Sequence, residues 1–127
     1  GSGIDYTETE YATNNRLWTH KAPTFKCTDT GDRFATSVGL ITADEVAYAG
    51  GVVNLRNSGY YLYTNDFYWT MSPCYNSGFT YVFFVVDSGY ISSQMVINRY
   101  GVRPVINLKA DTQFTSGNGT SSNPYTV

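Results

Sequence analysis

The hydrophobic and polar positions of this chain predict a series of short strands in its second half. The predicted strands cover residues 67–73, 80–87, 90–97 and 101–108. Each is a short run rich in β-branched and aromatic residues, bounded by residues typical of turns, which is the pattern of strands. Ser88 and Gly89 separate the second run from the third, so these two runs predict a tight β-hairpin. Pro73 is expected to end the first run.

Other segments have weaker patterns, two of which leave alternatives open. Residues 5–20 fit either a short helix or an irregular first strand. Residues 58–64 fit either a strand or an ordered loop. The remaining expected elements are a strand over residues 21–27, a turn over residues 28–34 and a short terminal strand over residues 125–127.

The clearest helix is predicted within residues 41–51, ITADEVAYAGG. Thr42 is a favourable N-cap residue, and Glu45 stands three residues later, which completes a capping box. Gly50 or Gly51 suits the left-handed position just after the helix. The residues expected to form its small packing face are Ala43, Val46, Ala47 and Ala49. One or two helices and many short antiparallel strands together predict the α+β class.

Length and composition are those of a single domain with few charges. The chain has 127 residues, so we expect residues 4–127 to form one domain, and GSG at residues 1–3 is typical of a cloning remnant. We therefore expect the chain to be the C-terminal part of a larger protein. Aromatic residues make up 17% and charged residues 14%, against about 25% charged residues in typical domains. This composition is typical of an extracellular or cell-surface module rich in β-structure.

Charge and hydropathy argue against two classes of partner. The net charge is −2 and no basic patch is present, so we expect no nucleic-acid partner. No apolar run approaches the ~18 residues of a membrane span, so we expect no direct membrane insertion.

Residues with catalytic or metal-binding chemistry are few. Cys27, Cys74 and His20 do not supply the ligands of a zinc site, and no catalytic motif is present. Asp44 and Glu45 are interpreted as acids of a first helical turn, favoured by the helix dipole, rather than as a catalytic pair. We therefore expect no catalytic residue, no metal and no cofactor. The two cysteines either form a disulfide, which would add roughly 4 kcal/mol, or remain unpaired thiols.

Four segments follow one another in an order that resembles a known domain family. They are GLITADEVAYAGG, YYLYTNDFYWTMSP, YVFFV followed by SGY, and YGVRPVINL. Over roughly residues 20–110, the chain resembles the C-type-lectin-like domains of the formylglycine-generating-enzyme kind. Such domains occur in variable proteins of diversity-generating retroelements and in pilin-like surface proteins of gut bacteria and phages. The resemblance implies a C-type-lectin-like fold, and the triplets of calcium-dependent lectins are absent.

The resemblance also implies a non-enzymatic binding module, in which a fixed scaffold displays a diversified face built from about residues 74–100. The partner would be a protein or glycan ligand on another cell or surface, and the location extracellular, at the cell surface or on a phage particle. A mixture of Tyr, Phe, Ser, Gly and Asn suits such a face. The residues expected to be exposed and to contact the ligand are Tyr75, Asn76, Ser77, Phe79, Phe84, Asp87, Tyr90, Ser92, Gln94 and Asn98.

The predicted central strand also allows a second interpretation. Residues 81–86 are apolar on both faces, which fits a strand buried on both sides. The family pattern instead suggests a scaffold side formed by Tyr81, Phe83 and Val85, with Phe84 and Val86 nearer the binding face. Trp69 is expected to pack in the core, and Arg103 to bond a carboxylate or backbone carbonyls. One alternative is therefore an undiversified structural or adhesion domain of a bacterial surface or pilus protein. Another, based on the resemblance alone, is an enzyme derived from the formylglycine-generating fold.

Overall fold

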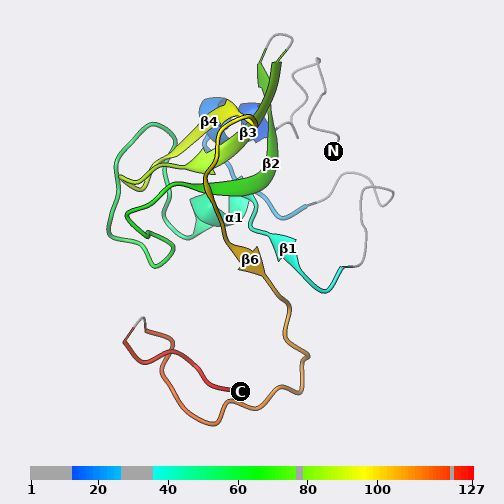
Figure 1. The fold of residues 1–127 in the computed structure, drawn as a ribbon, viewed down its shortest axis with the longest axis vertical. Coiled ribbons are helices and arrows are strands. Elements are labelled where there is room, and N and C mark those ends of the chain that lie inside the picture. Colours follow the sequence, from blue (N-terminus) through cyan, green and yellow to red (C-terminus); the bar gives the residue numbers. More distant parts are fainter. Residues whose placement is uncertain (1–12, 27–35, 77–78, 121) are drawn as a thin grey trace.

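Figure 1 shows the computed structural model, which describes residues 13–26, 36–76, 79–120 and 122–127. Its elements in chain order are the π-helix η1 (Asn15–His20), β1 (Gly39–Leu40), α1 (Ala43–Tyr48), β2 (Tyr68–Asn76), β3 (Phe79–Val85), β4 (Ile91–Met95), β5 (Gly101–Val102) and β6 (Pro104–Val105). The described part of the chain is therefore mixed α/β, mostly strands with two short helices.

Four strands form the main sheet, in the order β4-β3-β2-β5. The β2–β3 and β3–β4 pairs are antiparallel, whereas β5 runs parallel to β2. Strands β1 and β6 form a separate antiparallel pair. In Figure 1, β6 leads the chain away from the main sheet, and the C-terminal segment extends well beyond the body of the domain.

The hairpin predicted around Gly89 is confirmed, since β3 and β4 pair on either side of it. Gly89 has a φ of 83°, and its amide donates to the Val86 carbonyl at 2.7 Å. Glycine is favoured at such an angle, and a side chain there would also collide with the Asn57 backbone oxygen. The Tyr60 hydroxyl donates to the Gly89 carbonyl at 2.9 Å. Residues 58–64 are therefore an ordered loop that holds the turn, rather than a strand.

Strand β2 is longer than predicted, because Pro73 does not end it. Its pairing with β3 shifts register between Trp69 and Pro73, which marks a bulge. Strand β5 pairs only with the start of β2, so Pro73 lies on an edge of the described sheet where its missing N–H costs no ladder bond. Within the bulge, the Met71 N–H donates to the Ile41 carbonyl at 2.9 Å. The Ser72 hydroxyl accepts the first N–H of α1 at 2.9 Å, so the bulge and the helix start fit together.

Helix α1 begins and ends as predicted. Thr42 Oγ1 accepts the Glu45 N–H at 3.1 Å, and the Glu45 carboxylate accepts the Thr42 N–H at 2.7 Å. These two bonds are the reciprocal bonds of a capping box. At the other end, Gly50 has a φ of 117°, and the Gly51 N–H donates to the Val46 carbonyl at 2.9 Å. The last turn therefore closes in a Schellman motif, as expected for a glycine after the helix.

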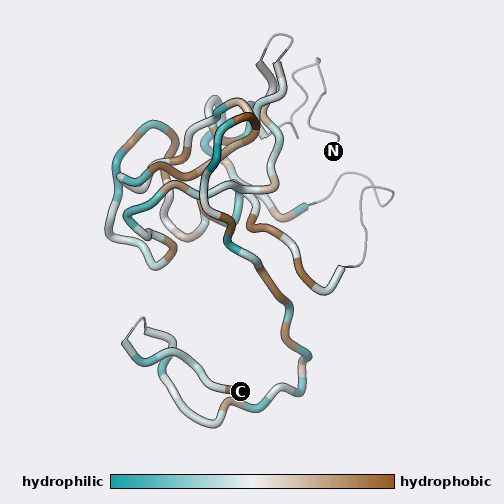
Figure 2. The backbone as a smooth tube through the Cα atoms, viewed as in Figure 1, coloured by the Kyte–Doolittle hydropathy of each residue, from teal (hydrophilic) through white to brown (hydrophobic). Residues whose placement is uncertain are grey.

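One face of the main sheet is buried beneath the two helices. The core cluster consists of Leu17, Ile41, Ala43, Val46, Val53, Tyr60, Leu62, Tyr68, Cys74, Phe83, Val85 and Ile91. Trp18 of η1 packs against the Phe83 ring, with 5.3 Å between ring centroids. Figure 2 shows apolar stretches gathered in the sheet and others along the extended segment after β6.

A buried ion pair joins the two helices. Asp44, in the first turn of α1, is only 4% exposed. Its carboxylate accepts two bonds from the Arg16 guanidinium, at 3.0 and 2.8 Å, and one from the Thr24 N–H at 2.9 Å. Bidentate charge-assisted bonds of this kind are among the stronger hydrogen bonds in proteins. Asp44 is therefore more than an acid favoured by the helix dipole, because it ties η1, the following segment and α1 together.

Three predicted strands are missing or divided. Residues 21–26 form no strand, and the Thr24 N–H in this segment bonds the Asp44 side chain instead of a neighbouring strand. The strand predicted over residues 101–108 is divided into β5 and β6, which belong to different sheets. The chain end forms isolated bridges, such as the one between Ser116 and Thr126, in place of a terminal strand.

Two further predictions fall partly or wholly outside the described residues. Residues 13–20 are helical, so the helix alternative for residues 5–20 is correct in the part that the structure describes. The turn predicted over residues 28–34 lies outside the described residues, and so does Cys27. A disulfide between Cys27 and Cys74 therefore stays untested.

We expect Asp44→Asn to lower the free energy of unfolding by about 3 kcal/mol, because breaking a buried ion pair leaves the other charge without its partner. The Arg16 side chain is 15% exposed, so it would regain little hydration. Urea unfolding followed by tryptophan fluorescence measures the change. Asp87→Asn is the matched control at an exposed site and should stay within about 0.5 kcal/mol of the parent. Equal unfolding midpoints for the two variants would contradict the role given to the pair.

Candidate ligand-binding face

Alternation along the strands divides the main sheet into two faces. Tyr68, Phe83 and Val85 belong to the core cluster on the inner face, against which both described helices pack. The side chains between them point the other way. We call the outer face the sheet surface formed by Trp69, Met71, Val82, Phe84, Ser92, Gln94 and Val102. The predicted division of β3, with Phe83 and Val85 on one side and Phe84 opposite, is thus present in the fold. Val86, which was also expected near the binding face, is buried.

The outer face is organised in rows across the strands. Trp69 lies opposite Phe84, Phe84 opposite Ser92, and Val102 beside Trp69. This row crosses all four strands and changes from apolar on β5 to polar on β4. Cross-strand neighbours of this kind lie roughly 5 Å apart, so the row is one continuous surface.

Four rings form a compact group on this surface, which we call the outer aromatic cluster: Phe67, Trp69, Phe84 and Tyr100. The Tyr100 ring stacks on Phe84 at 5.0 Å and on Phe67 at 5.1 Å, and it lies 4.9 Å from Trp69, measured between centroids. These distances are typical of favourable aromatic pairs. Tyr100 is therefore the centre of the cluster.

This cluster corrects two predictions. Phe84 was expected to be an exposed contact residue, but it is only 5% exposed because Tyr100 and Phe67 stack on its ring. Trp69 was expected in the core, but it lies half-buried on the outer face and outside the core cluster. The cause is the short strand β5, which places the preceding Tyr100 over the sheet: the Gly101 N–H donates to the Phe67 carbonyl at 2.9 Å.

The predicted polar contact residues of β4 and its following turn are half-buried. Gln94 Oε1 accepts the N–H of Met95 at 3.0 Å, and the Asn98 side-chain amide donates to the Met95 carbonyl at 3.2 Å. These two side chains therefore satisfy backbone groups at the end of an edge strand, which is one way in which proteins protect sheet edges. Ser92 lies on the outer face beside Phe84.

The other predicted contact residues lie at the two ends of the hairpins. Asp87 is exposed and Tyr90 is half-buried, both next to the β3–β4 turn. The backbones of Tyr75, Asn76 and Phe79 lie at the opposite end, where β2 and β3 pair. Their side chains, and Ser77 as a whole, lie outside what the structure describes. The predicted residues that the structure describes thus lie at both ends of the sheet, and the outer face includes only some of them, such as Phe84, Ser92 and Gln94.

Sequence reasoning missed several residues of this face. The outer aromatic cluster includes Phe67 and Tyr100, and the exposed apolar side chains beside it are Met71 and Val102. The sequence does hint at Tyr100, because it is an aromatic residue directly before a predicted strand. The pairing of that strand, β5, with β2 is a long-range contact, however, and a single sequence does not reveal it.

Arg103 has the structural role that was predicted. Its guanidinium donates to the Leu62 carbonyl and lies over the Tyr68 ring, 5.1 Å from the centroid. The Tyr68 hydroxyl donates to the same carbonyl at 3.2 Å. Burial raises the pKa of the Tyr68 hydroxyl, although the nearby Arg103 charge partly opposes this effect. Burial also raises the pKa of the Tyr60 hydroxyl. These groups fix the 58–64 loop rather than face solvent.

Several acidic and thiol groups of the described residues are buried or have structural partners. No three His, Cys, Asp or Glu side chains in that part of the chain are placed to hold a metal ion. The Cys74 thiol is buried, and burial raises its pKa, which lowers the fraction of reactive thiolate. Asp44 and Glu45 both have structural partners. Among the described helices, none has the length and apolar character needed to cross a membrane.

The chain is thus a mixed α/β domain whose main sheet carries helices on its inner face. Residues 6–110 match the family described as "Domain of unknown function (DUF6273)", and the chain belongs to this family. The match ends soon after β6, where the C-terminal segment leaves the body of the domain. No curated protein and no solved structure matches the chain.

We expect Phe84→Ala to lower the free energy of unfolding by about 3 kcal/mol, as for other large-to-small changes at buried rings. Ser92→Ala is the matched control, because Ser92 is the cross-strand neighbour of Phe84 on the same face. It should change stability by less than about 0.5 kcal/mol. Thermal and urea unfolding of the two variants decide between packing and contact roles. A Phe84→Ala protein as stable as the parent would contradict the packing role given to Phe84.

Proposed function

We propose that this domain is a non-enzymatic ligand-binding module of the receptor or adhesin type, and that the outer face of its main sheet contacts the ligand. The observation that carries the proposal is an apolar sheet surface opposite the helices. On it, Met71 is 45% exposed and Val102 is 63% exposed, beside the half-buried Trp69 and Tyr100. Exposed apolar patches of this kind often mark interaction sites.

The composition of this surface supports a macromolecular ligand. Aromatic and Met side chains in its centre give a large contact area, and Trp and Tyr are over-represented among the residues that dominate binding energy. Small polar side chains such as Ser92 and Gln94 lie at its β4 side and add adaptable hydrogen bonds. The expected partner is a protein or glycan ligand on another cell or surface, with the domain outside the cell, on its surface or on a phage particle.

The proposal extends to a C-type-lectin-like fold with a diversified face, as the family resemblance implies. The proposal is supported by the way in which the β3–β4 hairpin separates core side chains from outer-face side chains. Val82, Ser92 and Gln94 point away from the core cluster, so they could change without altering the packing of Phe83 and Val85. A scaffold of this kind tolerates variation on one side of a sheet while it keeps its core.

An undiversified structural or adhesion domain is the second candidate. Two observations favour it: the burial of Phe84 and the bonds that tie Gln94 and Asn98 to Met95. Under this alternative the aromatic cluster mainly packs the outer side of the sheet, and the contact surface is fixed.

Charge substitutions on the outer face test the proposed site. Met71→Arg and Ser92→Arg should each weaken binding about tenfold or more, because an unpaired charge placed in an apolar contact is costly. Thr19→Arg is the matched control, since Thr19 is exposed on η1 and thus lies on the helix side of the sheet. Binding of the fluorescently labelled domain to intact cells and to immobilised glycans gives the readout, and circular dichroism confirms that each variant is folded.

Two kinds of result would contradict the proposal. If Thr19→Arg weakens binding as much as the two outer-face variants do, or if none of the three changes it, the outer face is not the contact surface. If the parent domain binds no cell and no glycan in these panels, the receptor or adhesin proposal fails as a whole.

A further inference from the structure

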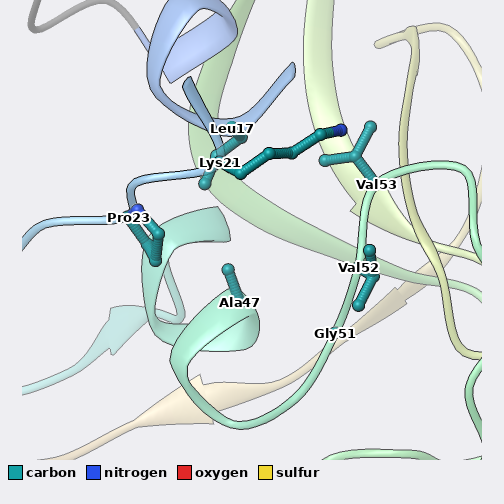
Figure 3. A pocket seen from close by; sticks show the side chains of 7 residues that line it. All are labelled: Leu17, Lys21, Pro23, Ala47, Gly51, Val52 and Val53. Atoms are coloured by element: carbon teal, nitrogen blue, oxygen red, sulfur yellow. The ribbon is translucent and has the colours of Figure 1, made fainter. Parts of the chain in front are cut away.

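A small apolar pocket lies on the helix side of the domain, remote from the outer face. It has a volume of about 280 Å³ and opens between η1, α1 and the segment that follows α1. Its apolar lining is formed by Leu17, Pro23, Ala47, Gly51, Val52 and Val53. Figure 3 shows these side chains around one hollow, with Ala47 of α1 on one side and Val52 and Val53 on another.

Lys21 is the one charged residue in this lining. It directly follows η1 and has a left-handed backbone, with φ 53° and ψ 32°. Figure 3 shows its side chain extending across the pocket toward Val53, with the ammonium at its far end. A non-glycine residue in this conformation is uncommon. The conformation here gives the pocket a cation that reaches over an apolar floor.

The acids around this region are already engaged. The Asp44 carboxylate bonds Arg16 and Thr24, and the Glu45 carboxylate bonds Thr42. No salt bridge of Lys21 is formed within the part of the chain that the structure describes. The pocket therefore combines an apolar interior with an ammonium that has no anionic partner there.

We propose that this pocket binds a small amphiphilic carboxylate, with its apolar body in the hollow and its carboxylate paired with Lys21. Size limits the apolar body. An apolar cavity of roughly 150 Å³ accommodates benzene, so the pocket has room for an apolar body of about six to eight carbons. Charge complementarity selects an anionic head, since the lining offers one cation and no acid. This inference is independent of the proposed function, because the two sites lie on opposite sides of the main sheet.

Nuclear magnetic resonance titration of the ¹⁵N-labelled chain tests the proposal with three probes of one chain length: octanoate, octanol and octylamine. Octanoate should shift the amide signals of Ala47, Val52 and Val53 in a saturable way. Octanol should bind the same amides more weakly, and octylamine should not bind, because its ammonium would face that of Lys21. Amide signals also report whether every variant is folded.

Three variants separate the contribution of the Lys21 charge from that of the apolar hollow. Lys21→Met should weaken octanoate binding about fivefold, the upper range for an exposed ion pair, and leave octanol binding unchanged. Lys26→Met removes a charge from an exposed lysine outside the lining and should change neither. Ala47→Leu should fill the hollow and abolish binding of both probes.

Several results would overturn the proposal. They are an octanoate response confined to the outer face, octylamine binding equal to that of octanoate, or a Lys21→Met protein that binds octanoate as the parent does. If Ala47→Leu does not fold, the comparison of Lys21→Met with Lys26→Met still decides. Failure here leaves the outer-face proposal intact, since that proposal predicts no effect of Lys21→Met on binding to cells or glycans.

Discussion

The Asp44 carboxylate is the contact on which the arrangement of the helices depends. It is buried at the start of α1, and it bonds the Arg16 guanidinium of η1 and the Thr24 N–H between the two helices. It adds a charged link among three backbone segments that also share the bond from the Tyr48 hydroxyl to the Pro23 carbonyl and the bond from the Ala22 N–H to the Arg16 carbonyl. The pair costs desolvation, but its bidentate geometry and the third bond compensate. This buried side chain therefore helps to fix η1 relative to α1, and the Lys21 pocket opens between these two helices.

The same helices explain why the two faces of the sheet differ. Because η1 and α1 cover one side, Phe83, Val85 and Ile91 are buried there. The alternate side chains of the same strands point to the uncovered side, which is closed only in part by the stacking of Tyr100 on Phe84. The outer aromatic cluster thus supports the sheet while its neighbours, Met71 and Val102, stay exposed. One face of the sheet thus combines a supporting aromatic cluster with exposed apolar side chains.

Local chemistry made some elements predictable. The capping residues of α1 and the glycine between β3 and β4 act through neighbouring backbone groups, so sequence alone located them. Long-range contacts were not predictable in this way. Pro73 was wrongly expected to end a strand. It is tolerated within β2 because β5 pairs only with the start of that strand, and this long-range pairing cannot be seen in the sequence. Phe84 was correctly placed opposite the scaffold side, but the ring that buries it comes from Tyr100, whose position depends on that parallel pairing.

The proposed diversified face requires variable side chains on one side of the β3–β4 hairpin and a fixed scaffold on the other. Deep sequencing of this gene across a population of its source organism tests this requirement most directly. We expect substitutions concentrated at adenine positions within codons 74–98, at outer-face residues such as Ser92, with Phe83 and Val85 unchanged. A uniform segment would remove the diversified face, and substitutions spread equally over both sides of the strands would contradict the division between scaffold and contact surface.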